Sequence, residues 1–199
     1  MRHGETAGQS SIRYYGCTDI PLSDTGRGQI RAARAALIDR LRGFENTRVF
    51  SSPLVRATES ARIITPADFP FTTIDEFREL NFGLFEGLTE EEIAERHPAD
   101  HARWIRDRLS MDYTFPGGDN RGLFAERVAR GIETALSDWS ADGYEGNTLV
   151  VAHRGVIRAI VRHLTTIAPD VPLASIQILS RSRQWHADSL DLIDHLAGL

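Results

Sequence analysis

The chain has 199 residues, the composition of an ordinary soluble globular protein and a formal net charge of -5 at pH 7. This length is enough for one well-buried domain, and the negative charge argues against nucleic acid or an anionic membrane as the main partner. All 23 basic residues are arginine, which excludes a lysine Schiff base, a pyridoxal phosphate anchor and a P-loop lysine. Any anion site must therefore use arginine, histidine or backbone N–H groups.

In chain order, helix-like and strand-like stretches alternate. We expect a helix over 23–43, a strand over 48–51, a helix over 53–64, a weak strand over 72–74, helices over 89–96, 98–109 and 120–139, a strand over 148–152, a helix over 155–164, and strands over 175–179 and 190–193. This alternation predicts a single α/β domain with a largely parallel sheet.

Local signals set several of these boundaries. Ser23 or Asp24 can cap the start of the first helix, and Gly43 can end it. Pro53 suits the first turn of the second helix. The acidic run 90–92 suits the N-terminal end of the helix that it opens, because the helix dipole favours negative charge there.

Cellular location is indicated by features that the sequence lacks. Cys17 is the only cysteine, so an intrachain disulfide is impossible. The N-terminal residues are polar and do not resemble a signal peptide, and the longest apolar runs are far too short to span a bilayer. We expect a cytoplasmic protein without a cofactor or a bound metal ion.

Chemically useful side chains occur where predicted strands end. Arg2 and His3 open the chain, Arg56 follows the strand over 48–51, and His153 follows the strand over 148–152. Glu79 lies in a predicted loop. Sites in open α/β sheets form at the carboxyl ends of strands. Guanidinium groups can hold a phosphate, a neutral imidazole can attack phosphorus and a carboxyl group can protonate the leaving oxygen.

Six segments, in order along nearly the whole chain, resemble the histidine phosphatase superfamily, the family of phosphoglycerate mutases and related phosphatases. They are RHGET (2–6), YGCTDIPLSDTG (15–26), SSPLVRATESA (51–61), ELNFGLFEGLTEEEI (79–93), FPGGDN (115–120) and VVAHRGVIRAI (150–160). The ordered set is far more specific than RHGE alone. The resemblance implies a three-layer α/β/α sandwich with a mostly parallel central sheet and a lid or cap over about 90–120.

The resemblance also implies a role for each candidate residue. His3 is expected to be the nucleophile that becomes phosphohistidine, and Glu79 to protonate the leaving group and then help activate water. Arg2, Arg56 and His153 are expected to hold the phosphate oxygens. The full substrate-binding set expected is Arg2, Gln9, Tyr15, Gly16, Arg56, His153 and Arg154.

The chain departs from the family pattern in four places. A hydrophobic core strand normally precedes the RHG motif and is absent here, so we expect that Met1 is an internal methionine of a longer natural protein or that the sequence is truncated; an intact-mass measurement would decide. Gln9 stands where many members carry asparagine. Arg154 replaces a glycine, and could point to solvent or bind a second anionic group of the substrate. PGGDN keeps the glycines of the family's PGGES turn.

The resemblance to the phosphatase branch, including α-ribazole phosphatase and broad-specificity phosphomonoesterases, predicts a metal-independent phosphomonoester hydrolase that acts on a small phosphorylated metabolite. A phosphoglycerate mutase-type phosphotransferase is an alternative, although such mutases are longer. A catalytically silent phosphate or phosphopeptide binder and a metallohydrolase are further alternatives, the last without a compact ligand motif. The oligomeric state stays open, a homodimer included.

Overall fold

A parallel three-stranded sheet forms the centre of the computed structural model, which describes residues 1–41, 43–137 and 146–197. Strand β1 (Thr47–Ser51) lies between β2 (Thr72–Thr73) and β3 (Asn147–Val151), and is parallel to both. Strands β4 (Ile176–Arg181) and β5 (Trp185–Leu192) form an antiparallel hairpin. The expected largely parallel sheet is therefore confirmed, with the two late strands paired to each other.

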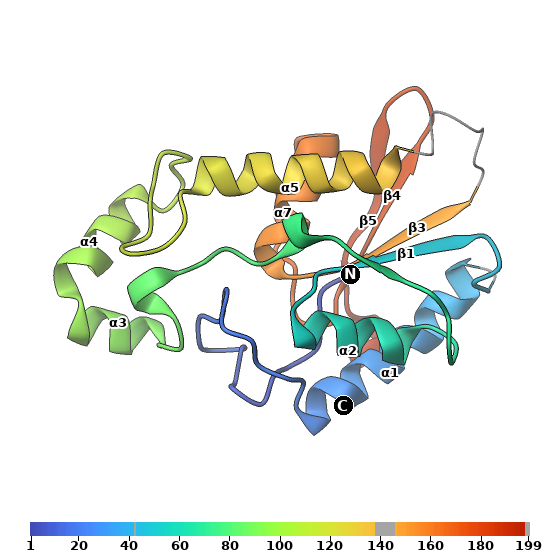
Figure 1. The fold of residues 1–199 in the computed structure, drawn as a ribbon, viewed down its shortest axis with the longest axis horizontal. Helices are drawn as coiled ribbons and strands as arrows, with labels where there is room; N and C mark the ends of the chain where they lie inside the picture. Colours follow the sequence, from blue (N-terminus) through green and yellow to red (C-terminus); the bar gives the residue numbers. More distant parts are fainter. Residues whose placement is uncertain (42, 138–145, 198–199) are drawn as a thin grey trace.

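The two faces of the parallel sheet carry separate apolar cores. In β1, Val49 packs in the core with α1 and α2, whereas Phe50 packs against the core with α5 and α7. In β3, Leu149 and Val151 join the first core and Val150 contacts the second. Alternate residues of a strand face opposite sides of the sheet. The expected three-layer α/β/α arrangement is confirmed (Figure 1).

The helices lie close to their predicted positions. They are α1 (Asp24–Leu41), α2 (Val55–Ile64), α3 (Glu90–Arg96), α4 (Pro98–Asp107), α5 (Arg121–Leu136) and α7 (Arg154–Thr165). Ser23 Oγ accepts a hydrogen bond from the Gly26 N–H at 3.0 Å, which confirms the expected cap. Thr89 and Glu92 form a reciprocal capping box at the start of α3. The predicted helix end at 138–139 lies outside the described residues.

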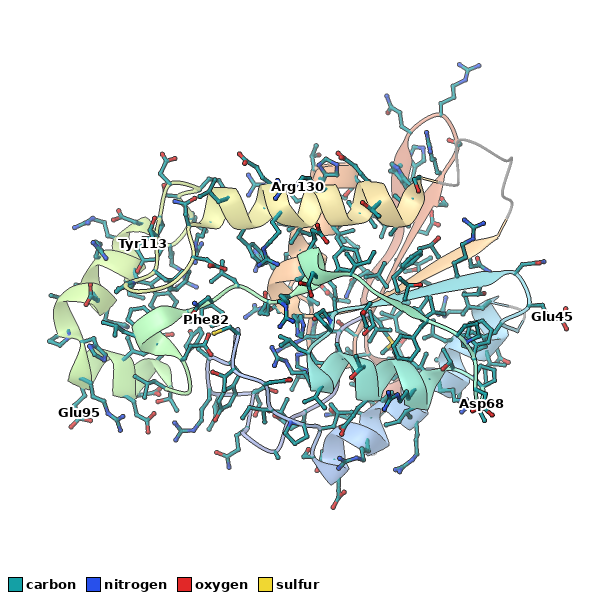
Figure 2. All side chains as sticks on the ribbon, viewed as in Figure 1. Glu45, Asp68, Phe82, Glu95, Tyr113 and Arg130 are labelled. Carbon is teal, nitrogen blue, oxygen red and sulfur yellow. The ribbon has the colours of Figure 1, made fainter. Side chains whose placement is uncertain are left out.

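Helices α3 and α4 lie at the end of the molecule that is far from the strands (Figure 1). Aromatic rings connect α4 and the residues that follow it to the rest of the molecule. Tyr14 contacts Trp104 of α4 at 5.5 Å between ring centroids, and Phe82 contacts Phe115 at 5.2 Å. Tyr113 contacts Phe115 at 5.0 Å, and Figure 2 shows Phe82 and Tyr113 among the side chains of this part. The segment 90–120 is thus packed onto the loops beside the N-terminus.

The N-terminal residues lie between β3 and the residues that precede β4. The amine of Met1 donates to the Val150 carbonyl at 2.6 Å, and Arg2 pairs in parallel with Ala152. On the other side, the Arg2 N–H donates to the Ser175 carbonyl at 3.0 Å. His3 is therefore held by main-chain hydrogen bonds on both sides.

An apolar cavity of about 220 Å³ adjoins Met1. Leu149 and Val150 of β3 line one part of it, and Ile176 and Ile178 of β4 line another. This cavity lies beside the main-chain edges of two strands that belong to separate sheets.

Candidate functional site

The five side chains expected to carry the chemistry lie together at the carboxyl ends of β1 and β3. The rings of His3 and His153 are 5.2 Å apart between centroids, in an edge-to-face arrangement. The Arg56 Nε–H donates to His153 Nδ1 at 3.2 Å. Glu79 accepts a hydrogen bond from the Gly155 N–H, two residues beyond His153, at 2.9 Å, and Arg2 pairs with Ala152. Residues far apart in sequence therefore form one buried polar cluster.

His3 is held in the tautomer that a nucleophile requires. Its ring is 4% exposed, and Nδ1 lies 2.7 Å from the Gly4 carbonyl oxygen. A carbonyl can only accept a hydrogen bond, so the proton of the neutral ring lies on Nδ1 and Nε2 keeps its lone pair. Burial, followed by the positive charges of Arg56 and Arg2, lowers the pKa of His3 well below its usual value.

Arg56 fixes the tautomer of His153. A guanidinium N–H can only donate, so Nδ1 of His153 is the acceptor and Nε2 carries the proton. Nε2 in turn lies 2.8 Å from the hydroxyl of Ser52, a fully buried residue that sequence analysis did not single out. Burial, and then Arg56, lowers the pKa of His153 well below its usual value. A phosphate contact from His153 must compete with Ser52 for this proton.

Arg56 is fully buried and donates to three main-chain carbonyls as well as to His153. Its NH1 group donates to Thr18 at 2.9 Å, and its NH2 group donates to Gly16 at 2.7 Å and to Tyr15 at 3.3 Å. Tyr15 and Gly16, which were expected to contact phosphate, thus contribute carbonyls to Arg56. The guanidinium group of Arg56 is therefore held rigidly, because both of its terminal nitrogens already donate to carbonyls.

Glu86 holds the loop that carries these carbonyls. Its carboxylate accepts hydrogen bonds from the main-chain N–H groups of Gly16, Cys17 and Thr18, at 3.1–3.3 Å, and from the Thr18 hydroxyl at 2.6 Å. A Cβ atom at Gly16 would collide with the Leu80 carbonyl and with Glu86. Glycine is therefore required at position 16 for the loop to approach this closely.

Arg2 has an N–H group that lacks a partner. Its NH1 donates to the Val171 carbonyl at 2.9 Å, but its buried Nε has no hydrogen-bond partner among the described residues. Burial lowers the pKa of Arg2 to about 10, so the side chain stays charged near pH 7. An unpaired buried N–H costs about 1–3 kcal/mol.

Two main-chain N–H groups position Glu79, which follows the short helix η1 (Asp75–Phe77) and is 7% exposed. Its carboxylate oxygens accept from the Leu80 and Gly155 N–H groups, each at 2.9 Å. A Cβ at position 155 would collide with this carboxylate, so a larger residue there would displace the Glu79 side chain. Glu79 therefore lies against the start of α7, close to His153.

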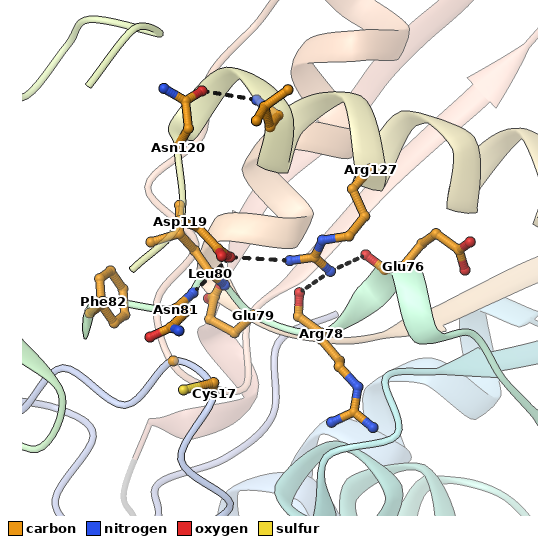
Figure 3. Close-up of polar contacts among 12 residues, drawn as sticks. Cys17, Glu76, Arg78, Glu79, Leu80, Asn81, Phe82, Asp119, Asn120 and Arg127 are labelled. Atoms are coloured by element: carbon orange, nitrogen blue, oxygen red, sulfur yellow. Dashed lines mark hydrogen bonds and ion pairs between the residues drawn. The ribbon is translucent and has the colours of Figure 1, made fainter. Parts of the chain in front are cut away.

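Arg127 and Asp119 brace the segment that carries Glu79 (Figure 3). Arg127 NH1 donates to the carbonyls of Glu76 and Arg78, at 2.8 and 2.9 Å. Asp119 accepts from the Asn81 N–H at 3.0 Å and forms an ion pair with Arg127 at 3.7 Å. Asp119 belongs to the FPGGDN turn, the only sequence signal that could have indicated its role.

The two remaining candidates, Gln9 and Arg154, are exposed. Gln9 is exposed, with φ of 63°, and its main-chain oxygen accepts from Ile12 and Arg13; its side chain makes no hydrogen bond within the described residues. Arg154 is exposed, and its Nε donates to the Asp170 carbonyl at 2.8 Å. The positions of Gln9 and Arg154 leave a substrate contact as a prediction for each.

Among the described residues, no group of three or more His, Cys, Asp or Glu side chains is arranged to hold a metal ion. No helix in the described part of the chain is long and apolar enough to cross a membrane.

We predict that the protein loses stability in mild acid, because two buried histidines lie neutral in the fold. Burial, and then the charges of nearby arginines, hold the pKa values of His3 and His153 well below 6.5. Below pH 6.5 the unfolded chain therefore binds more protons than the folded chain, so stability rises with pH in this range.

Urea unfolding between pH 5 and pH 8.5, in buffer free of phosphate, would measure this loss. The decline should begin near pH 6.5 and continue down to pH 5, as the two histidines become protonated in the unfolded chain. A free energy of unfolding that stays constant over this range would contradict the prediction.

The chain is similar to known families, proteins and solved structures. A family model described as histidine phosphatase superfamily (branch 1) matches residues 1–184. A bifunctional protein of Mycobacterium tuberculosis is 37% identical over 164 residues, which is 81% of this chain and 42% of that protein. The chain thus spans less than half the length of this relative.

Two other relatives are 30% identical to the chain and have different activities. One is a glucosyl-3-phosphoglycerate phosphatase of Mycolicibacterium vanbaalenii, and the other is a 2,3-bisphosphoglycerate-dependent phosphoglycerate mutase of Cytophaga hutchinsonii. Each match covers 85% of this chain, and 74% and 78% of the relatives respectively. The structure of α-ribazole phosphatase from Shigella flexneri superposes with a TM-score of 0.80 at 24% identity, covering 96% of this chain and 94% of that one. This superposition supports the fold.

Proposed function

The chain belongs to the histidine phosphatase superfamily, and on that premise we propose that it hydrolyses a phosphomonoester of a small metabolite through a phosphohistidine on His3. The observation that carries the proposal is the state of His3: a buried neutral ring with its proton on Nδ1 and its lone pair on Nε2. Arg2 and Arg56 lie beside this ring with their charges largely uncompensated by carboxylates at hydrogen-bond distance.

The reaction proceeds in two displacements at phosphorus. Nε2 of His3 attacks the phosphorus atom, the ester P–O bond breaks, and the protonated carboxyl group of Glu79 gives its proton to the leaving oxygen. Water then attacks the phosphohistidine, and the Glu79 carboxylate takes a proton from it. The P–N bond breaks, and inorganic phosphate leaves. Arg2, Arg56 and His153 stabilise the negative charge of the phosphoryl group in both steps.

A mutase is the second candidate, because a mutase relative is as similar to this chain as a phosphatase relative is. A mutase returns the phosphoryl group to the bound intermediate, whereas a phosphatase gives it to water. The segments ELNFGLFEGLT (79–89) and HRGVIRA (153–159) resemble the phosphatase branch, which favours hydrolysis. We propose that the segment 90–120 acts as the lid over the substrate.

Phosphate release from a panel of sugar phosphates, nucleotides and 3-phosphoglycerate tests this proposal. Phosphate release should persist in EDTA and fall with vanadate. During turnover the protein should carry a phosphoryl group that is lost in acid and kept in alkali, as expected for a P–N bond. Formation of 2-phosphoglycerate without phosphate release would indicate the mutase. Activity that disappears in EDTA would indicate a metallohydrolase, and no turnover of any ester would indicate a binding protein.

A further inference from the structure

The segment 170–175, which precedes β4, holds Arg2 in place beside His3. The main-chain N–H of Arg2 donates to the Ser175 carbonyl at 3.0 Å. The NH1 group of the Arg2 side chain donates to the Val171 carbonyl at 2.9 Å. Both the main chain and the guanidinium group of Arg2 are therefore positioned by carbonyls of this one segment.

This segment contains backbone conformations that its residues rarely adopt. Val171 has a φ of 58° and Ala174 a φ of 54°, and both residues are fully buried. The left-handed region is sterically unfavourable for residues other than glycine, and most of all for a β-branched residue such as valine. Pro172 adds to the strain, because a residue that precedes proline favours an extended backbone. Contacts from outside the segment must therefore hold Val171 in its conformation.

Asp191 of β5 supplies such a contact. Its Oδ1 atom accepts a hydrogen bond from the Val171 N–H at 2.8 Å, and its Oδ2 atom accepts one from the Asp170 N–H at 2.9 Å. Within the described residues, Asp191 makes no ion pair. Hydrogen bonds to an ionised carboxylate are stronger than those between neutral groups. The carboxylate therefore fixes two consecutive peptide units at the strained position.

The hairpin of β4 and β5 holds Asp191 in position for this contact (Figure 1). Asp191 has a φ of 54°, which aspartate adopts more readily than most residues. Its main-chain N–H donates to Oε1 of Gln177 in β4 at 2.6 Å. Gln177 Nε2 donates in turn to the Ser175 hydroxyl at 2.9 Å. Asp191 is thus connected to both ends of the segment that holds Arg2.

We propose that Asp191 is a positioning residue for phosphoryl transfer: it fixes the main chain at Val171, whose carbonyl fixes the guanidinium group of Arg2. The inference rests on the proposed function, in which Arg2 holds oxygens of the phosphoryl group. Without the Asp191 carboxylate, Val171 relaxes towards an ordinary backbone conformation and its carbonyl no longer accepts from Arg2. The Arg2 side chain then keeps its charge and loses its orientation, so the site binds a phosphate-like anion more weakly.

Calorimetric titration with vanadate tests this inference in a double-mutant cycle. Asp191→Asn should raise the Kd for vanadate about tenfold, because asparagine tolerates the φ of 54° but has only one acceptor oxygen. In an Arg2→Gln background the same change should alter the Kd by less than about twofold, because the side chain through which Asp191 acts is gone. Equal effects in the two backgrounds would overturn the inference, since a purely structural role does not depend on Arg2.

Asp188→Asn is the matched control, because Asp188 is an exposed aspartate on the same strand and accepts from the Ser180 hydroxyl at 3.0 Å. It should leave the Kd for vanadate unchanged, and an effect as large as that of Asp191→Asn would count against the inference. Asp191→Glu keeps two acceptor oxygens on a longer side chain. It should raise the Kd less than Asp191→Asn does, because its carboxylate is displaced from the two N–H groups.

Urea unfolding of each variant shows whether it is folded under the conditions of the titration. If Asp191→Asn is unfolded, Asp191→Glu replaces it in the cycle: a raised Kd that disappears without Arg2 supports the inference, and an unchanged Kd overturns it. The cycle needs no turnover, so a protein that hydrolyses no ester refutes the proposed function and still decides the inference. Wild-type protein that does not bind vanadate would overturn the inference, because Arg2 would then hold no such anion.

Discussion

Replacing His3 with asparagine is expected to lower kcat for phosphomonoesters by at least about 10⁴-fold, because no other group at the site can accept the phosphoryl group. His153 lies nearby, but both of its ring nitrogens are engaged, with Arg56 and Ser52. The asparagine amide can still donate to the Gly4 carbonyl that holds Nδ1 of His3. Arg2 and Arg56 remain, so the variant should still bind inorganic phosphate or vanadate.

Steady-state kinetics and calorimetric titration with vanadate would measure the two effects separately. His163→Asn is the control, because His163 is exposed and its closest acidic contact is Glu133 at 3.6 Å. The control should keep wild-type kcat. If the His3 variant retained more than about 1% of the activity, a different nucleophile would have to be sought.

Replacing Arg56 with lysine is expected to impair both turnover and folding. Lysine keeps the positive charge but cannot reach the three carbonyls and the His153 nitrogen that the planar guanidinium contacts together. Buried carbonyls would lose their donors, at about 1–3 kcal/mol each. We expect the free energy of unfolding to fall by about 3 kcal/mol and kcat to fall by about 10²–10³-fold.

Urea unfolding would measure the loss of stability, and phosphate-release kinetics on the same preparation would measure the fall in kcat. Arg62→Lys offers a matched comparison, since Arg62 lies on the same helix and is exposed. That change should alter stability by less than about 0.5 kcal/mol and leave kcat as it is. A fully active Arg56→Lys protein would show that the guanidinium geometry is unimportant.

The sequence predicted the elements that have strong apolar signals. The strand over 148–152 and the helix over 155–164 differ by one residue at each end from β3 and α7. Strand β5 was expected only over 190–193, because its first half, from Trp185 to Ser189, alternates partly buried and exposed residues without an apolar run. Its pairing with β4 depends on a hairpin that short-range patterns did not reveal.

The site residues likewise divide into those that the sequence identified and those that it did not. Those that follow a strand or lie in a specific motif, such as His3, Arg56 and His153, were identified from the sequence and do lie together. Ser52, Glu86 and Asp119 were missed. Each acts on a main-chain group or a ring that lies 38 to 101 residues away along the chain. No local pattern carries that information, because the partners become neighbours only in the folded molecule.

The carboxylate of Glu86 has a mechanical consequence. It lies in the segment that leads into α3, yet it holds the loop of Gly16, Cys17 and Thr18. That loop in turn holds Arg56, whose guanidinium touches His153. A shift of α3 that displaced Glu86 would have to carry the loop with it or break this group of hydrogen bonds. A movement of α3 and the position of the Arg56 guanidinium are thus linked through one side chain.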